Sequence, residues 1–304
     1  MNKAFKVKPV FKDYLWGGQK LISKLHKDTK INPCAESWEL STHKDGLSFC
    51  DEGESKGITL KQILIEHPDY LGRYANENGD LPILIKFIDA LSDLSIQVHP
   101  SDEYALKNEG ELGKTEVWYI LESDNGHLAV GFKNDTNSEE VKKAIEDNTI
   151  CDYINYFNVK KDEFYPIESG TVHAIGGGTM LVEIQENSNL TYRLYDYDRV
   201  GKDGKKRSLH VDKALKVLDY SKYEKVNQEE LNYQCKYFSL NKVIDNCVLD
   251  TDEDHFMTLI CINGDCLIKT SNEQLNIKLA DTVFVPSCCH IEIIGKETLL
   301  KVEV

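Results

Sequence analysis

Two short stretches of the sequence place side chains that can bind a metal at alternate positions. In SIQVHP, Gln97 and His99 alternate with the apolar Ile96 and Val98. Side chains at i and i+2 of a β-strand point to the same face, so Gln97 and His99 would converge on one spot. The pair is therefore either the polar edge of a buried strand or half of a metal site.

The second stretch, GKTEVWYI, repeats this spacing with Lys114 and Glu116, and GTVHAIGGG later supplies His173. Imidazole, carboxylate and amide oxygen are suitable ligands for zinc or another borderline divalent ion. An open coordination position would make such an ion a Lewis acid. Spacing alone leaves the ligand set open, because four other histidines could compete for this role: His127, His210, His255 and His290.

The segments that carry these residues have the pattern of short β-strands. LPILIKFIDA, EVWYILES and TMLVEIQ are rich in β-branched and aromatic residues and are bounded by turn-forming residues. Helices are expected between them. One is capped at Thr59 and closes before Pro68, one has Ser138 as its N-cap, and one covers residues 211–219.

The character of the sequence changes after residue 220. SKYEKVNQEELNY is polar and charged, as in a linker, and short strand-like segments resume from about Tyr233. Their spacing is typical of an all-β sandwich or barrel. We therefore expect a β-rich domain over residues 1–225, with interspersed helices and the residues named above, and an all-β domain over residues 226–304.

The composition is that of an ordinary globular protein, with 304 residues, 41% of them hydrophobic and 29% charged. The net charge of −15 argues against nucleic acid or an anionic membrane as the main partner, and an anionic substrate would need a locally basic pocket. The nine cysteines form no disulfide or zinc framework, MNKAFKVKPV is no signal peptide, and no apolar run approaches the ~20 residues that cross a bilayer. These features predict a cytoplasmic protein with reduced thiols.

The combined motifs resemble the type I mannose-6-phosphate isomerases, zinc-dependent enzymes of the cupin superfamily, in their short bacterial form. They follow the family's order from about residue 5 to residue 218, whereas the C-terminal quarter carries little motif. The long helical insertion of larger members between the Glu and the last His ligand is absent. The resemblance rests on DYLWGGQKL, ESWELS, LPILIKFIDA with SIQVHPSDEYA, GKTEVWYIL, GTVHAIGGGTMLVEIQENSNLTYRLYDYDR and LHVDKAL.

The resemblance implies a mainly β fold of cupin-type jelly-roll barrels. The N-terminal barrel would bind the metal and carry the helices, and a smaller, degenerate barrel would follow it. One Zn²⁺ per chain would be held by Gln97, His99, Glu116 and His173. Arg193 and Lys114 would be the catalytic residues; a guanidinium stacked on tyrosine and a solvated surface lysine are the structural alternatives.

Three further residues are expected to bind the substrate. Lys86 lies within the apolar segment LPILIKFIDA, where it either reaches the surface or holds the phosphosugar. Glu36 and Trp38 in ESWELS would line or support the pocket. Lys86, Lys114 and Arg193 would together give an acidic protein the local positive field that a dianionic substrate needs.

The implied activity is a metal-dependent aldose–ketose isomerisation between D-mannose 6-phosphate and D-fructose 6-phosphate through a cis-enediol. Two alternatives are a sugar-phosphate-binding cupin without catalysis and a cupin enzyme acting on another sugar. The sequence does not single out the general base; Lys114, Glu36, Glu183 and water at the metal are candidates. The expected partner is a small phosphosugar, with no nucleic acid or membrane, and the chain would be a monomer or weak homo-oligomer.

Overall fold

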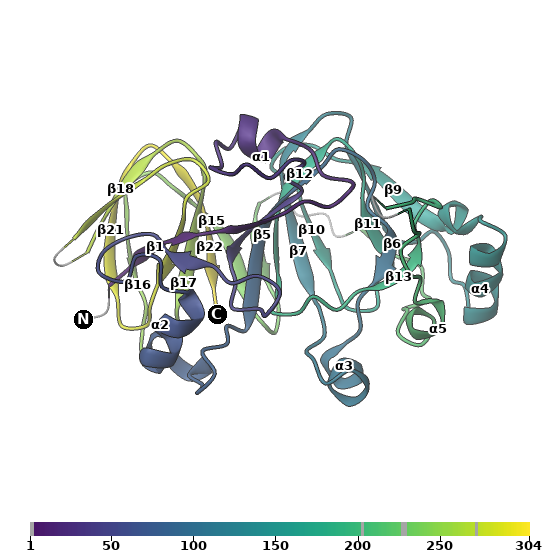
Figure 1. Cartoon of the computed structure of the whole chain (residues 1–304), viewed down its shortest axis with the longest axis horizontal. Helices are drawn as coiled ribbons and strands as arrows, with labels where there is room; N and C mark the ends of the chain where they lie inside the picture. The colour runs from purple at the N-terminus through teal and green to yellow at the C-terminus, as the bar shows by residue number, and fades with distance from the viewer. Residues whose placement is uncertain (1–2, 202–203, 226–229, 271–272) are drawn as a thin grey trace.

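The structure is a computed structural model, and it describes residues 3–201, 204–225, 230–270 and 273–304. In the described residues, antiparallel strands form four sheets that build the core of the fold (Figure 1). The expected mainly β fold with helical additions is confirmed, and within the described ranges the sheets stack as open layers rather than closed barrels. In the same ranges, no helix is both long and apolar enough to cross a membrane.

Two sheets come from the N-terminal two thirds of the chain. The six-stranded sheet has the order β10 (Phe164–Ile167), β7 (Glu116–Ser123), β12 (Thr179–Glu186), β5 (Ile83–Ala90), β3 (Glu36–Leu40) and β2 (Val10–Lys12). The five-stranded sheet has the order β13 (Tyr192–Tyr195), β6 (Ile96–Val98), β11 (His173–Ile175), β8 (His127–Phe132) and β9 (Ile154–Asn158).

The other two sheets contain the C-terminal strands. The seven-stranded sheet has the order β14 (Asn232–Gln234), β15 (Ser239–Ile244), β22 (Thr298–Glu303), β17 (Met257–Asn263), β20 (Thr282–Val285), β1 (Phe5–Lys8) and β4 (Phe49–Cys50). The four-stranded sheet has the order β16 (Cys247–Asp250), β21 (His290–Gly295), β18 (Cys266–Lys269) and β19 (Gln274–Ile277). The N-terminal strands β1 and β4 thus extend a C-terminal sheet. The expected domain boundary adjoins residues 226–229, which lie outside the described residues, so it stays a prediction.

Within the described residues, five short α-helices connect the strands: α1 (Lys20–Ser23), α2 (Leu60–Glu66), α3 (Asp102–Asn108), α4 (Ser138–Glu146) and α5 (Val211–Ala214). Helix α2 begins as expected, because the Thr59 side chain accepts the N–H of Gln62. Two 3₁₀ segments lie at Pro68–Tyr74 and Ile150–Tyr153.

Two helix predictions need correction. The N-cap of α4 is Asn137 rather than Ser138, because the Asn137 side-chain oxygen accepts the N–H groups of Glu139 and Glu140. Helix α5 ends at Ala214 rather than 219. Its chain then tightens into turns, with the N–H groups of residues 217 and 218 both donating to the Ala214 carbonyl.

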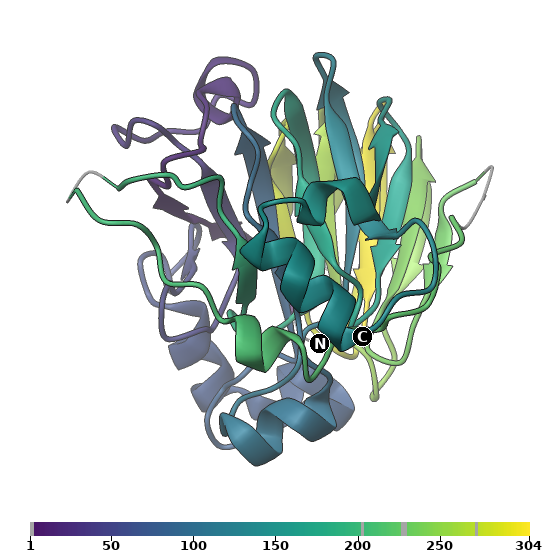
Figure 2. The ribbon, with the colours of Figure 1, turned by 90° about the vertical axis from the view of Figure 1, so that its right-hand side faces the viewer.

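The six-stranded sheet is buried on both faces, and every residue of β5 and β12 is buried. On β5, Ile83, Ile85 and Phe87 belong to a core shared with the seven-stranded sheet. Ile88 faces the opposite way, into a core shared with the five-stranded sheet. Apolar residues of α4 and α5 cover the outer face of the five-stranded sheet, and these helices lie in front of the strands in Figure 2.

Polar side chains interrupt the core between the six- and five-stranded sheets. By the alternation of β-strands, Lys86 points with Ile88 into this space, and Glu183 points with Leu181. From the five-stranded sheet, Ile96 and Val98 pack outward in the core beneath the helices. This leaves Gln97 to face the same interior as Lys86 and Glu183.

Candidate active site

Three side chains able to bind a metal meet between these two sheets. His99 follows β6, Glu116 opens β7 and His173 opens β11. All three are buried, and their ligand atoms lie within 4.8 Å of one another. Nε2 of His99 is 3.8 Å from one oxygen of Glu116, and Nε2 of His173 is 3.5 Å from the other. No other three His, Cys, Asp or Glu side chains converge in this way within the described ranges.

Hydrogen bonds to the backbone fix both imidazoles in the tautomer that a ligand needs. Nδ1 of His99 is 2.8 Å from the Leu190 carbonyl oxygen, and Nδ1 of His173 is 2.8 Å from that of Thr171. A carbonyl oxygen only accepts, so each Nδ1 carries the proton and each Nε2 presents a lone pair. Burial lowers the pKa of His99 well below its usual value and that of His173 to about 4, so both rings are neutral at pH 7.

Glu116 supplies a carboxylate oxygen that accepts no hydrogen bond from the residues that the structure describes. Its Oε1 is buried without a hydrogen bond, an arrangement that costs about 1–3 kcal/mol when nothing compensates for it. Its Oε2 accepts a hydrogen bond from the ammonium group of Lys114. Two imidazole lone pairs and a free carboxylate oxygen in one buried spot fit a divalent cation, and this donor set is typical of catalytic zinc sites.

Gln97 lies beside the three-residue cluster. Its Cα is opposite that of His173 in the β6–β11 ladder, and its amide nitrogen is 3.4 Å from Nε2 of His173. The amide nitrogen can donate to this lone pair, and a half-turn of the amide group exchanges nitrogen for oxygen. Gln97 is therefore placed either to orient His173 or to offer a fourth ligand.

Two buried lysines share one carboxylate next to the cluster. Nζ of Lys114 is 3.4 Å and Nζ of Lys86 is 3.1 Å from Oε1 of Glu183. Nζ of Lys114 also lies 3.3 Å from Nε2 of His99. Lys114 thus connects the cluster to Glu183, and Glu183 connects Lys114 to Lys86.

The two lysines determine the charge states of the carboxyl groups. Burial opposes the ionisation of Glu183, but Lys114 and Lys86 outweigh it and lower the pKa of Glu183 to about 2. Burial and the charge of Glu183 raise the pKa of Glu116 to about 7, against the influence of Lys114. Burial would lower the pKa of Lys86, but Glu183 and Glu36 raise it above its usual value. Glu183 is a weak base at this pKa, so it is better suited to holding the lysines than to abstracting a proton.

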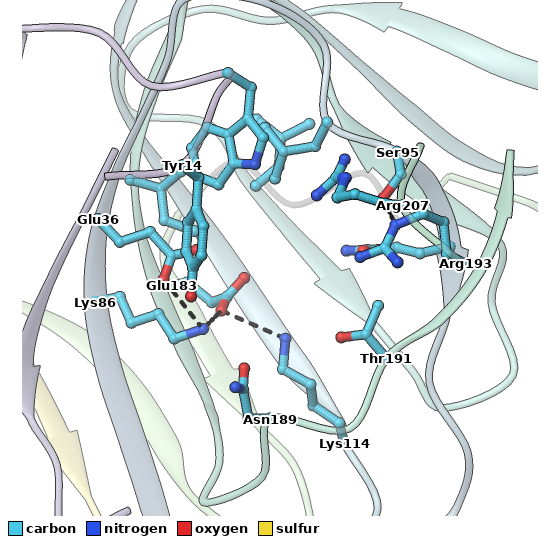
Figure 3. Close-up of a pocket in the computed structure, with 15 residues that line it drawn as sticks. Tyr14, Glu36, Lys86, Ser95, Lys114, Glu183, Asn189, Thr191, Arg193 and Arg207 are labelled. Carbon is cyan, nitrogen blue, oxygen red and sulfur yellow. Dashed lines mark hydrogen bonds and ion pairs between the residues drawn. The ribbon is translucent and has the colours of Figure 1, made fainter. Parts of the chain in front are cut away.

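A cavity of about 270 Å³ opens over this group (Figure 3). Five of the residues predicted to bind ligand line it: Glu36, Lys86, Gln97, Lys114 and Arg193. The buried cluster of His99, Glu116 and His173 lies behind Gln97 and Lys114, which contact it directly. A small molecule in the cavity would therefore contact Gln97 and Lys114, the residues next to the metal-ligand cluster.

An arginine pair occupies another part of the cavity wall. Arg193 donates from Nε to the Ser95 hydroxyl at 3.2 Å and from Nη1 to the Ser208 carbonyl at 3.0 Å, and no described carboxylate forms an ion pair with it. Arg207 is held by two hydrogen bonds to Asp196, of 2.8 and 2.6 Å. Figure 3 shows both guanidinium groups close together, on the opposite side of the cavity from Glu36 and Lys86. An anion entering the cavity would meet two positive charges there.

Trp38 is fully buried and is not among the cavity-lining residues. Its indole N–H donates to Oε2 of Glu36 at 2.6 Å, and Nζ of Lys86 lies 5.1 Å from its ring centre. Trp38 therefore supports two residues that do line the cavity. The four other histidines named above lie outside the cluster. His127, His255 and His290 have aspartate neighbours, and Nδ1 of His210 accepts the backbone N–H of Arg193.

Several cavity residues had no sequence prediction, chiefly Tyr14, Ser95, Thr191 and Arg207. Arg207 lies in the basic run KDGKKRS, which has the pattern of a solvated turn. No local signal marks it as a pocket residue, because its orientation depends on Asp196. Tyr14 belongs to the motif DYLWGGQKL, which gave family information but no role for this side chain.

Comparison with known proteins gives consistent results. A family model described as the phosphomannose isomerase type I catalytic domain matches residues 4–137. The mannose-6-phosphate isomerase ManA of Bacillus subtilis is 38% identical over 246 residues, covering 77% of each chain. The crystal structure of the mannose 6-phosphate isomerase from Bacillus subtilis matches with a TM-score of 0.91 and 31% identity over 100% of both chains. A mannose 6-phosphate isomerase bound with zinc and yttrium shares the fold, with a TM-score of 0.78 at 15% identity over 98% of both chains.

Proposed function

Because the chain belongs to the type I phosphomannose isomerase family, we propose that it interconverts D-mannose 6-phosphate and D-fructose 6-phosphate. One observation carries the proposal: a single cavity is lined by Gln97 and Lys114, which contact the buried His–Glu–His cluster, and by an arginine without a carboxylate partner among the described residues. The cluster suits a divalent cation, and the guanidinium group suits a phosphate.

The proposed cofactor is one Zn²⁺ per chain. His99, Glu116 and His173 would hold it, with Gln97 as the fourth ligand. The donor set supports zinc, since two neutral imidazoles and a carboxylate match its preference for nitrogen and oxygen ligands. When bound, zinc would supply Lewis-acid stabilisation of the oxygen charge that develops in the reaction.

The reaction moves a proton between C2 and C1 of the sugar through a cis-enediol, and negative charge builds on the sugar oxygens. Lys114 and Lys86 hold two ammonium groups at the cavity wall, and Glu183 fixes both. Positive charge that is already in place stabilises such developing charge without a reorganisation cost. We therefore assign a catalytic role to Lys114 and a substrate-binding role to Lys86.

Glu36 is the proposed acceptor for sugar hydroxyl groups. Trp38 fixes its carboxylate through the indole N–H, and Lys86 lies 3.9 Å from the same oxygen. A carboxylate oxygen has capacity for more than one hydrogen bond, so a hydroxyl can be added to this arrangement. Trp38 contributes to substrate binding through Glu36.

The substrate phosphate is assigned to Arg193, with Arg207 beside it. The protein carries a net charge of −15, so a dianionic substrate depends on a local positive field. Phosphate binding at Arg193, away from the reacting carbons, would hold C1 and C2 next to the cluster and Lys114. Binding energy from a remote group can be used in this way to orient the reacting centre, which makes Arg193 part of the catalytic machinery.

The test is to incubate the purified protein with fructose 6-phosphate and to follow mannose 6-phosphate. Activity should disappear after chelation and return on addition of zinc. Binding of fructose 6-phosphate without turnover in a zinc-replete, folded sample would instead indicate a sugar-phosphate-binding protein. Turnover of another sugar alone would indicate a different cupin enzyme.

The proposed setting of this activity is the cytoplasm. All nine cysteines are free thiols, which suits a reducing compartment. The proposed partner is the small phosphosugar itself. We propose a monomer or weak homo-oligomer as its state.

A further inference from the structure

A tyrosine from the C-terminal part of the chain reaches the segment that carries Lys114 and Glu116. Tyr237 lies between β14 and β15, and its hydroxyl donates to Oδ2 of Asp102 at 2.8 Å. Nζ of Lys236 lies 3.6 Å from the same oxygen. Asp102 is the first residue of α3, so this contact joins residues 135 positions apart.

Asp102 belongs to a set of acceptors that hold three consecutive backbone N–H groups. Residues 113, 114 and 115 donate in turn to Oδ1 of Asp102 at 3.0 Å, to the Pro100 carbonyl at 3.0 Å and to Oε2 of Glu186 at 2.7 Å. The N–H of Glu186 returns a hydrogen bond to the Thr115 carbonyl at 3.1 Å. The backbone on either side of Lys114 is thus fixed immediately before β7 begins at Glu116.

The two carboxyl groups of this set also bind each other. Burial, together with a hydrogen bond to Asp102, raises the pKa of Glu186 to about 8. Glu186 therefore keeps its proton at pH 7 and can donate it to the ionised Asp102. Asp102 consequently accepts from Tyr237, from Gly113 and from Glu186, and Tyr237 also contacts Glu186.

The contact between α3 and the Lys114 segment is also tight in a steric sense. A Cβ atom added at Gly113 would lie 2.4 Å from the backbone nitrogen of Asp102. Such a distance means that the two backbones are closely packed. A displacement of Asp102 is therefore transmitted to Gly113 and then to Lys114. Lys114 is within 3.3 Å of His99 and 3.4 Å of Glu183, where small displacements matter.

We propose that Tyr237 is a positioning residue of the active site, which acts through Asp102 and Glu186 to hold Lys114 and Glu116 in place. Tyr237 does not line the cavity, so its role is not one of substrate contact. The proposal gives the C-terminal part of the chain a function in catalysis, and it rests on the proposed isomerase function. The Tyr237 hydroxyl restricts the motion of residues 113–116.

The test compares Tyr237→Phe with Tyr233→Phe in the full-length, zinc-loaded protein. Tyr233 is a matched control, because its hydroxyl also approaches an N-terminal acid, Glu168, at 3.4 Å, but has no contact with residues 113–116. Misplacing a catalytic group by about 1 Å can cost on the order of 10²-fold in rate, so Tyr237→Phe should lower kcat about tenfold with KM changed by less than about twofold. Tyr233→Phe should leave both parameters unchanged.

Amide hydrogen exchange gives a second readout that does not depend on activity. In Tyr237→Phe, the amides of residues 113–115 should exchange at least about tenfold faster, while the rest of β7 keeps its protection. Unchanged exchange at these amides would overturn the proposal, as would an equal loss of kcat in both variants. If the wild-type protein does not isomerise fructose 6-phosphate, the proposed function fails, and exchange still decides whether Tyr237 fixes this segment.

A double-mutant cycle tests the route through Asp102. Asp102→Ala removes the acceptor for Tyr237 and for Gly113, so it should speed exchange at residues 113–115 by more than Tyr237→Phe does. Because Tyr237 also contacts Glu186, which holds the Thr115 N–H, Tyr237→Phe should have a smaller effect in the Asp102→Ala background than in the wild type. Independent, additive effects of the two substitutions would overturn the proposed route.

Discussion

Gln97 and His173 are directly opposite each other across the β6–β11 ladder, although 76 positions separate them in the sequence. On its other side, Gln97 is paired with Arg193 of β13. Three neighbouring strands therefore place His173, Gln97 and Arg193 in one row. His173 and Gln97 are proposed metal ligands, and Arg193 is the proposed phosphate ligand. A one-residue slip of β6 would turn Gln97 and His99 out of the interior, so the register itself specifies the site.

His173→Ala should abolish zinc binding. The substitution removes one of three buried ligands, and even the loss of a residue that merely supports a zinc ligand typically costs about 10–100-fold in affinity. Elemental analysis after dialysis should give about one zinc per wild-type chain and less than about a tenth of that for the variant. Isomerase activity should fall to background.

His127→Ala is the control for this experiment. His127 is also a histidine of the five-stranded sheet, but it is outside the cluster, and its Nε2 is 3.5 Å from Asp93. This variant should retain stoichiometric zinc. Zinc retained in His173→Ala after exhaustive dialysis would mean that the metal is bound elsewhere.

Zinc uptake should release a single proton between pH 5 and pH 6.5. Burial lowers the pKa of His99 well below its usual value and that of His173 to about 4, so both imidazoles are already neutral in this range. Burial raises the pKa of Glu116 to about 7, so Glu116 is the ligand that must lose a proton. Zinc affinity should therefore rise about tenfold per pH unit up to pH 6.5 and level off above pH 8.

Calorimetry in buffers of different ionisation enthalpy measures this proton release. One proton per zinc at pH 5.5 and almost none at pH 8.5 is the expected result. Release of two or three protons at pH 5.5 would show that the histidines are protonated before metal binds. In that case the buried, neutral tautomers described above would not be the state that receives zinc.

Much of the site could be predicted because its residues alternate within single strands. The i, i+2 spacing of Gln97 and His99 was sufficient to place both on one face, and Ile96 and Val98 do pack on the other. Mainly β architecture follows from the same local patterns. The resemblance to a known family then selected His173 and Arg193, which spacing alone could not connect to His99.

Features that depend on distant partners could not be predicted. Strand β1 joins a C-terminal sheet through the pairing of Phe5 with Phe284, and no local pattern encodes a partner so far along the chain. Arg207 enters the cavity wall because Asp196 holds it there. Helix α3 was not expected either, although Ser101 caps it, because the strand and proline before it dominated the pattern.

Arg193→Ala should reduce turnover by about two orders of magnitude while zinc stays bound. Charge-assisted hydrogen bonds to a phosphate contribute about 1.5–3 kcal/mol each, and Arg193 has no described carboxylate to replace the phosphate. Arg207→Ala should mainly raise KM, by about tenfold, because Asp196 already satisfies part of its guanidinium group. Steady-state kinetics with fructose 6-phosphate and inhibition by inorganic phosphate measure both effects.

Arg73→Ala serves as the control, since Arg73 does not line this cavity. Its kinetic constants should equal those of the wild-type protein. An Arg193→Ala enzyme with full turnover would show that Arg193 has no part in the mechanism. Unchanged inhibition by phosphate in both cavity variants would show that phosphate binds elsewhere.

Glu186→Gln should make the protein more stable at alkaline pH than the wild type. Burial and Asp102 raise the pKa of Glu186 from 4.5 to about 8, so the folded protein keeps a proton that the unfolded chain releases above pH 4.5. The wild-type free energy of unfolding must therefore fall as the pH rises from 4.5 to 8, by up to roughly 5 kcal/mol from this group. Glutamine cannot ionise, and its amide can still donate to Asp102 and accept from Thr115.

Urea unfolding at pH 5.5 and pH 8.5 gives the required comparison, with chelator present so that zinc binding does not contribute. Glu186→Gln should exceed the wild type in free energy of unfolding by more at pH 8.5 than at pH 5.5. Glu224→Gln is the control, because the Glu224 side chain is 78% exposed and should show no such pH dependence. The same difference at both pH values would mean that Glu186 is ionised in the fold, and that Asp102 and Glu186 are held together by Tyr237 and Lys236 rather than by a shared proton.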